Sequence, residues 1–170
     1  MALNKLSLLL FTLLLLSSSC LRYSFTGVSI PEGVNTIYIP FFPDQSNSGL
    51  SDLSDRLNRA LIDRFVNQSR LSLSNNENEA DAVLDGVILT YSNRPFSVAG
   101  SEEATQNQVV VTVRATFTYQ DDEGALWNKS FNGNFTFDPN VDPIEGERDA
   151  ADQALQQIAN NMFNDAVSNW

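Results

Sequence analysis

The segment 108–120, QVVVTVRATFTYQ, alternates apolar and polar side chains along its whole length. Because successive side chains of a β-strand point to opposite sides, the two kinds fall on opposite faces of one strand. The apolar face takes Val109, Val111, Val113, Ala115, Phe117 and Tyr119, and the polar face includes Thr112, Arg114, Thr116 and Thr118. A strand of this kind belongs in a sheet that is covered by other elements on one side only.

A turn and a second alternating strand follow directly. Residues 121–124, DDEG, have the composition of a hairpin turn. The next strand is predicted over 126–137, with Trp127, Phe131, Phe135 and Phe137 on its apolar face and Asn128, Ser130, Asn132 and Asn134 opposite. Lys129 falls in the apolar phase, which predicts either a bulge nearby or a side chain that reaches past a sheet edge.

The remaining chain predicts three further strands and two helices. A first strand is expected over 36–42, a short one over 70–74 and a long one over 80–91, which Arg94-Pro95 ends. Leucines at three- and four-residue spacing, from Leu50 to Leu61, predict an amphipathic helix that continues to Phe65. A final helix opens at about Glu145, with an apolar stripe of Ala151, Leu155, Ile158, Met162, Ala166 and Trp170.

These elements fit together in one economical way. Both helices bring a single apolar stripe, and the long strands bring one apolar face. The predicted fold class is therefore α+β: a two-layer sandwich with two helices packed on one face of a mixed, mainly antiparallel sheet of four to five strands. About 150 residues remain after a short leader, which is enough for one domain with a proper core.

The leader itself has the form of a secretory signal. A single cation, Lys5, precedes the nearly continuous apolar run 6–16, and three serines then lead to Cys20, the one cysteine of the chain. The run is too short to span a bilayer as a helix. The arrangement resembles the lipobox of bacterial lipoproteins, in which the cysteine becomes the acylated first mature residue. Ser17 departs from it, since a leucine usually stands three places before the cysteine.

The lipobox reading divides the chain into residues 1–19 as a lipoprotein signal peptide, 20–31 as a lipid-anchored tether and 32–170 as one α+β domain. Cys20 is then the lipidation site, and the mature protein has no free thiol. An ordinary cleaved secretory signal is the alternative. For a single cysteine without this context, the commoner interpretation is a small buried apolar side chain.

Charge and composition exclude several classes of function. The net charge is −11, and it becomes −12 without Lys5, the only charge in the first nineteen residues. Such an acidic chain is a poor ligand for polyanions, so no nucleic-acid partner is expected. The chain has no histidine, which removes the usual general base near neutral pH and the commonest transition-metal ligand.

No catalytic or metal site stands out from the sequence. The serines have no histidine to activate them, and no Gly-x-Ser-x-Gly motif is present. The acidic loop with Asp138, Asp142, Glu145 and Glu147 lacks the spacing of an EF-hand calcium site. We therefore expect neither an enzyme nor a cofactor. A glycoside hydrolase needs only two suitably placed carboxylates, but the acidic residues here fall on predicted helix faces, turns and loops, where solvation explains them. Such an enzyme is therefore the least favoured alternative.

Several segments resemble the LptE family of lipopolysaccharide-assembly lipoproteins in its Bacteroidetes form. They are the lipobox cysteine, "YSFTG" at 23–27, "SIPEGVNTIYIPFF" at 29–42, "ADAVLDGVILTYSNRP" at 80–95 and the terminal Trp170 after an amphipathic helix. The resemblance implies an α+β sandwich anchored to the inner leaflet of the outer membrane, facing the periplasm. It also implies a role as a plug that helps the large LptD β-barrel to fold and lipopolysaccharide to reach the cell surface.

The polar faces of the two long strands are the candidate partner surface. They carry Thr112, Arg114, Thr116, Thr118, Asn128, Ser130, Asn132 and Asn134. Such hydroxyl and amide groups both donate and accept hydrogen bonds, which suits a wet, polar contact with an LptD-like barrel. Ordinary solvent exposure is the simpler explanation. Direct lipopolysaccharide binding stays open, with Arg114 and Lys129 as the only cations near this face. An anchored envelope protein that binds a soluble ligand or peptidoglycan is the alternative function.

Overall fold

The computed structural model describes residues 30–96, 106–122 and 124–168. The strands are β1 (Thr36–Tyr38), β2 (Ser72–Leu73), β3 (Ala82–Phe96), β4 (Gln106–Tyr119) and β5 (Ala125–Phe137). The helices are α2 (Leu53–Ile62), a π-helical turn η1 (Asp63–Asn67) that continues it, a short 3-10 turn η2 (Glu77–Glu79) and the long α3 (Pro143–Ser168).

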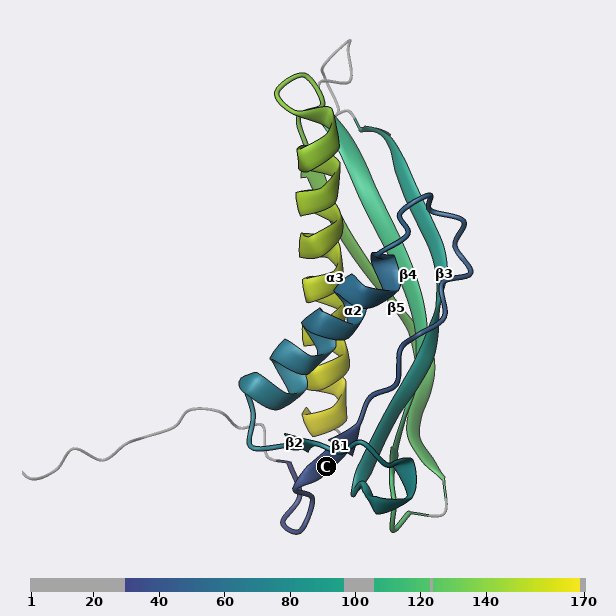
Figure 1. The fold of residues 1–170 in the computed structure, drawn as a ribbon, viewed down its shortest axis with the longest axis vertical. Helices are drawn as coiled ribbons and strands as arrows, with labels where there is room; N and C mark the ends of the chain where they lie inside the picture. Colours follow the sequence, from purple (N-terminus) through teal and green to yellow (C-terminus); the bar gives the residue numbers. More distant parts are fainter. Residues whose placement is uncertain (1–29, 97–105, 123, 169–170) are drawn as a thin grey trace, which may run out of the picture.

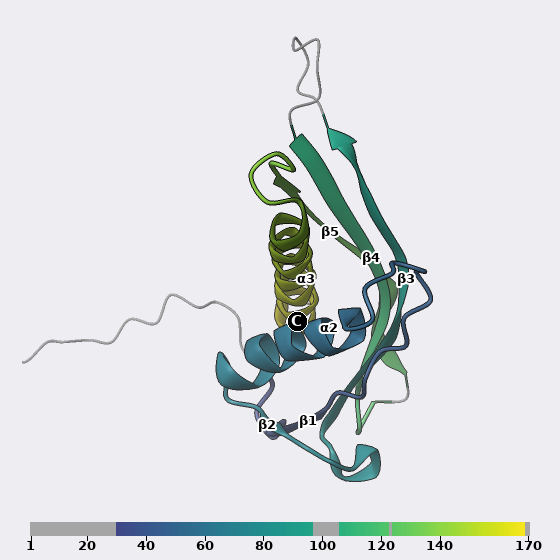
Figure 2. The same ribbon diagram turned by 45° about the horizontal axis from the view of Figure 1, so that its top comes forward.

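The five strands form one sheet in the order β2-β1-β3-β4-β5. β1 runs parallel to β2 and β3, whereas β3, β4 and β5 pair antiparallel. Both helices lie on the same side of this sheet: α3 runs along its length, and α2 crosses obliquely (Figures 1 and 2). The two-layer α+β sandwich predicted from the sequence is confirmed.

The predicted phase of β4 is also confirmed. All six apolar-phase residues of this strand are buried, and the residues between them are half-buried or exposed. Phe117 stacks on Trp127 of β5, with ring centroids 5.7 Å apart, and on Phe65 of η1, with centroids 6.2 Å apart. One aromatic cluster therefore joins the two long strands to the helix layer.

The two helices meet each other as well as the sheet. Leu53, Leu57 and Leu61 of α2 are fully buried, and so are the predicted stripe residues of α3 that the structure describes; Trp170 lies outside the described residues. Arg56 connects the helices, because its guanidinium contacts Asp52, the N-cap residue of α2, and Asp152 in α3, each at 2.8 Å. The four-residue spacing from Asp52 to Arg56 is one that ion pairs on a helix use, whereas no local spacing indicates the bridge to α3.

Two glycines allow close approach between the layers. A Cβ on Gly133 in β5 would lie 2.0 Å from the backbone oxygen of Ala154 in α3. A Cβ on Gly86 in β3 would lie 2.5 Å from the ring of Phe42. Glycine at these positions therefore lets a helix backbone and an aromatic ring pack directly against the sheet.

β3 does not end at Arg94-Pro95 as the sequence predicts. The strand continues to Phe96, and Pro95 pairs with Asn107 of β4. The short β1 reaches only Ala82 and Val83 on the other side of β3, so the second half of β3 has an open edge there. A proline is tolerated on an edge strand where its missing N–H would have faced solvent.

β1 is shorter than predicted, because it ends at Tyr38 rather than Phe42. The chain then passes Pro40 and Pro43, which have no N–H to donate to a strand ladder. It meets β3 again at a parallel bridge between Asp44 and Ile88. The loop that follows β1 thus continues along the edge of β3 (Figure 1).

Two residues of β5 are explained by its position at the sheet edge. Nζ of Lys129 lies 2.5 Å from a carboxylate oxygen of Asp165 in α3. The side chain thus reaches past the sheet edge, which was one of the two predicted alternatives. Phe135 is predicted on the apolar face, but its side chain is 46 % exposed. It shares a hollow with Gln153, Gln156 and Gln157 of α3. A neighbouring strand would cover this ring, and β5 has none on that side.

Candidate partner-binding surface

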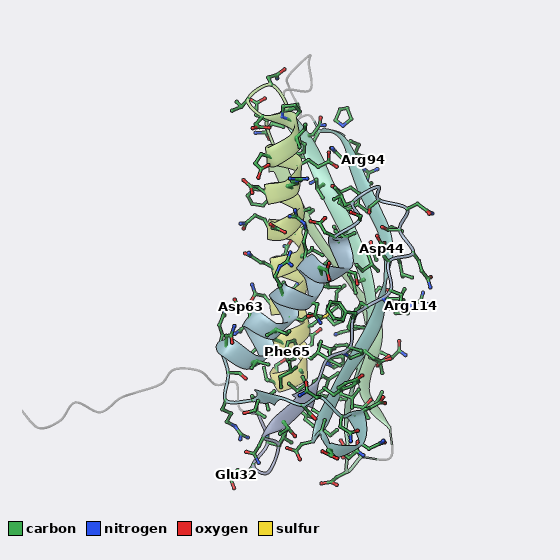
Figure 3. All side chains as sticks on the ribbon, viewed as in Figure 1. Glu32, Asp44, Asp63, Phe65, Arg94 and Arg114 are labelled. Carbon is green, nitrogen blue, oxygen red and sulfur yellow. The ribbon has the colours of Figure 1, made fainter. Side chains whose placement is uncertain are left out.

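The structure brings the predicted polar residues together as one ribbon on the sheet face opposite the helices. Direct cross-strand neighbours are Thr112 with Asn132, Arg114 with Ser130, and Thr116 with Asn128. The two ends of the ribbon differ: Thr118 lies opposite Ala125, and Asn134 lies opposite Val110. Figure 3 shows Arg114 on the side of the sheet that faces away from α2 and α3.

Hydrogen bonds order the side chains of the ribbon. The hydroxyl of Thr112 donates to Oδ1 of Asn132 at 2.8 Å, and Nε2 of Gln108 donates to Oδ1 of Asn134 at 3.3 Å. Gln108 was not among the predicted residues, although its position in the polar phase of β4 was a sufficient signal. These bonds leave amide hydrogens and carbonyl oxygens that are able to meet a polar partner.

β3 extends the ribbon to a third strand. On β3, the cross-strand partners of the polar-phase residues of β4 are Val83, Asp85, Val87, Thr90, Ser92 and Arg94. A bulge between Ile88 and Thr90 shifts the phase of β3 by one residue. Strand periodicity in the sequence therefore fails in the second half of β3, and these residues are not among the predicted partner surface.

The ribbon is almost neutral in a strongly acidic protein. The chain carries a net charge of −11, yet the only charged side chains on this face of β3, β4 and β5 are Asp85, Arg94 and Arg114. All three are exposed. The face thus lacks the negative charge that would repel an acidic partner.

An open cleft of about 400 Å³ lies at the opposite end of the sheet from the β5–α3 loop, and its lining includes Glu32, Asp81, Tyr119 and Asp122. The carboxylate of Asp81 accepts hydrogen bonds from the backbone N–H groups of Asn35 and Thr36 and from the Thr36 hydroxyl. These bonds hold the pKa of Asp81 below its usual value. These hydrogen bonds fix the start of β1 against the loop before β3.

Tyr119 is likewise structural. Its hydroxyl donates to the backbone oxygen of Ala166 in α3 at 3.1 Å. Burial, and to a smaller extent the negative charge of Asp122, raise the pKa of Tyr119 to about 12. The phenol is therefore neutral at physiological pH and links β4 to the end of α3.

The acidic loop before α3 serves as a helix cap. Oδ1 of Asp142 accepts hydrogen bonds from the backbone N–H groups of Ile144 and Glu145, at 3.2 and 3.0 Å. Pro143 is the first helical residue, so the helix begins two residues before the predicted Glu145. Over the described ranges, no three His, Cys, Asp or Glu side chains gather as a metal site would require.

The proposed lipidation site, Cys20, and the signal residues before it lie outside the described residues. Among the helices that the structure describes, none has the length and apolar character needed to cross a bilayer.

Comparison with known families identifies the chain. The model of the lipopolysaccharide-assembly family LptE matches residues 34–166, which is most of the chain and all of its described strands. The chain belongs to the LptE family. The family predicted from the leader, the segments 23–27, 29–42 and 80–95 and the terminal Trp170 is thereby confirmed, together with its coarse function, lipopolysaccharide assembly. No curated protein matches the chain.

Solved structures share the fold of this LptE-family chain at low identity. A protein of Xanthomonas campestris has a TM-score of 0.60 and 10% identity, covering 84% of this chain and 91% of its own. A minor lipoprotein of Acinetobacter baumannii has a TM-score of 0.50 and 14% identity, with coverages of 82% and 95%. A neuraminyllactose-binding hemagglutinin homologue of Helicobacter pylori has a TM-score of 0.50 and 16% identity, covering 84% of this chain and 88% of its own. At these identities the likeness concerns the fold alone.

Proposed function

We propose that this protein is an outer-membrane lipoprotein that plugs an LptD-like β-barrel, helps it to assemble and assists the passage of lipopolysaccharide to the cell surface. The observation that carries the proposal is the family match over residues 34–166. The protein acts in this role as a non-enzymatic binding partner. It is anchored through Cys20 and faces the periplasm, with residues 1–19 removed, 20–31 as tether and 32–170 as the plug domain.

The neutral ribbon supports this role. A plug inside a hydrated barrel needs a surface that forms hydrogen bonds in either sense and tolerates bridging water. Thr112, Thr116 and Asn132 supply such groups from two adjacent strands. A free sheet face usually carries many long charged side chains for solubility, whereas this one carries few.

A charge substitution tests the contact. The double variant Thr116→Glu with Asn132→Glu places two carboxylates on the ribbon, where they must be desolvated if a barrel covers them. Both side chains point away from the core, so the domain keeps its fold. We expect the variant to retain the melting temperature of the soluble domain that lacks Cys20, and to lose most of the LptD-like barrel that co-purifies from detergent-solubilised outer membrane.

A matched control carries the same added charge elsewhere. Ser51 and Asn75 are exposed loop residues away from the ribbon, and Ser51→Glu with Asn75→Glu should leave co-purification at the wild-type level. Equal capture of the barrel by both double variants would show that the ribbon is merely solvated. Recovery of glycan fragments, in place of a barrel, would favour the anchored binding module instead.

A further inference from the structure

The outer edge of β5 is the longest unpaired strand edge in the described sheet. β5 pairs with β4 on one side and has no strand on the other, whereas the opposite edge of the sheet is the two-residue β2. An unpaired edge presents a row of N–H and C=O groups that are able to bind another extended chain. This edge is therefore the strongest candidate template in the molecule.

The direction of one hydrogen bond shows which groups face outward. The backbone N–H of Asn134 donates to Oε1 of Gln157 in α3 at 2.9 Å, so it points away from β4. Main-chain groups alternate in direction along a strand, which places the N–H and C=O of Asn132, Ser130 and Asn128 on the same open side. The close contact between Thr112 and Asn132 side chains agrees, because non-hydrogen-bonded pairs bring side chains nearer.

Gln157 therefore occupies the open edge of β5 only at Asn134. Within the described residues, no side-chain acceptor reaches the backbone N–H of Asn128, Ser130 or Asn132, in contrast to that of Asn134. The open stretch is thus five residues long, from Asn128 to Asn132. That length is typical of a short strand pairing.

The helix beside this edge adds a row of amides. Two adjoining hollows of about 480 and 340 Å³ lie between β5 and α3 and share Asn161. Their helix side is lined by Gln153, Gln156, Gln157, Asn160, Asn161 and Asn164, together with Asp165. The strand side adds the exposed ring of Phe135.

Charge selects the kind of occupant. Lys129 and Asp165 are the only charged residues that line the hollows, and they neutralise each other at 2.5 Å. A neutral groove does not favour a phosphate or another polyanion. A second copy of the chain carries the same net charge of −11, so repulsion between the whole molecules opposes self-association at this edge. An uncharged polar segment of a different protein meets neither obstacle.

We propose that the β5 edge from Asn128 to Asn132 binds an extended, uncharged polar segment of the barrel partner, which adds a sixth strand to the sheet beside the amide row of α3. This inference rests on the proposed function, because it takes the occupant from the barrel. Asn128, Ser130 and Asn132 have their side chains on the ribbon and their backbone N–H and C=O groups on the open edge, so the two surfaces are continuous.

Proline at Ser130 tests the main-chain bond. Its N–H faces outward, so Ser130→Pro removes a donor from the open edge without breaking the ladder to β4. Ser130→Ala removes the hydroxyl and keeps the donor. We expect the full-length lipidated Ser130→Pro protein to bind the barrel roughly tenfold more weakly than Ser130→Ala, because both variants lose the ribbon hydroxyl and only the proline also loses the outward N–H. Equal binding by all three proteins would overturn the proposal, and so would equal loss in both variants.

Crosslinking keeps the test decisive if the proline variant folds poorly. A photoactivatable phenylalanine at Asn132 of the full-length protein should crosslink to one segment of the barrel, identified by mass spectrometry. The same probe at Leu73, an exposed residue of β2, should give no such product. A crosslink from Asn132 to a second copy, or to no protein at all, would overturn the inference. If the barrel still co-purifies, the proposed function survives that result; if wild type captures no barrel, the function itself fails.

Discussion

Phe117 shows how much one position of β4 depends on the face to which it points. Its ring is 2 % exposed and contacts aromatic rings from η1, β4 and β5. We expect Phe117→Ala to lower the free energy of unfolding by about 3–5 kcal/mol, because the lost contacts leave a cavity in a packed core. Chemical denaturation of the soluble domain measures this change.

The neighbouring residue provides the control for this prediction. Thr116 points to the opposite face, and Thr116→Ala should change the unfolding free energy by about 0.5 kcal/mol or less. Phe131 is 6 % exposed, and Phe131→Ala should resemble Phe117→Ala. Similar melting of the Phe117 and Thr116 variants would contradict the assignment of faces.

Asp81 makes the stability depend on pH. Its folded-state pKa lies below the ordinary value of 3.8, chiefly because the Asn35 N–H, the Thr36 hydroxyl and the Thr36 N–H bond the charged form. The stabilisation is complete above pH 3.8 and is lost as the pH falls from there through the folded-state pKa. We expect Asp81→Asn to melt below the wild type at pH 7, with the gap closing below pH 3.8. A gap that stays constant with pH would exclude this role for the carboxylate.

At the scale of elements, the contact between α3 and β5 depends on a missing side chain. A Cβ at Gly133 meets the backbone of Ala154, which has no flexible end that could move aside. We expect Gly133→Ala to destabilise the domain by about 1–3 kcal/mol through overpacking. Thermal unfolding of the soluble domain measures this loss.

Gly124 is the matched control, since a Cβ there meets nothing within 4 Å. Gly124→Ala should leave the melting temperature almost unchanged. An equally small effect of Gly133→Ala would contradict the close backbone contact between α3 and β5 at this position.

At the scale of the whole molecule, we propose that Cys20 attaches the protein to the membrane. We expect Cys20→Ala to abolish palmitate labelling and to release the mature domain from the membrane fraction, because the acyl chains on this cysteine are the proposed anchor. Salt should not extract the wild type. Unchanged palmitate incorporation in the variant would refute lipidation at this residue.

The sequence by itself determined the two faces of β4, the stripes of both helices and the layer architecture. Each of these follows from a local period: alternate residues of β4 and every third or fourth residue of α2 and α3 must share one environment. The segments 23–27 and 80–95 also indicated the family. Periodicity predicts burial well because burial on one face is its physical cause.

Only the tertiary structure decided what lies at the edges of those elements. The phase shift at the β3 bulge, the exposure of Phe135 and the bridge from Arg56 to Asp152 depend on which segments come to lie beside one another. The capture of the Asn134 N–H by Gln157 joins residues 23 positions apart. No local period encodes such contacts, because an edge is defined by the neighbour that a strand lacks.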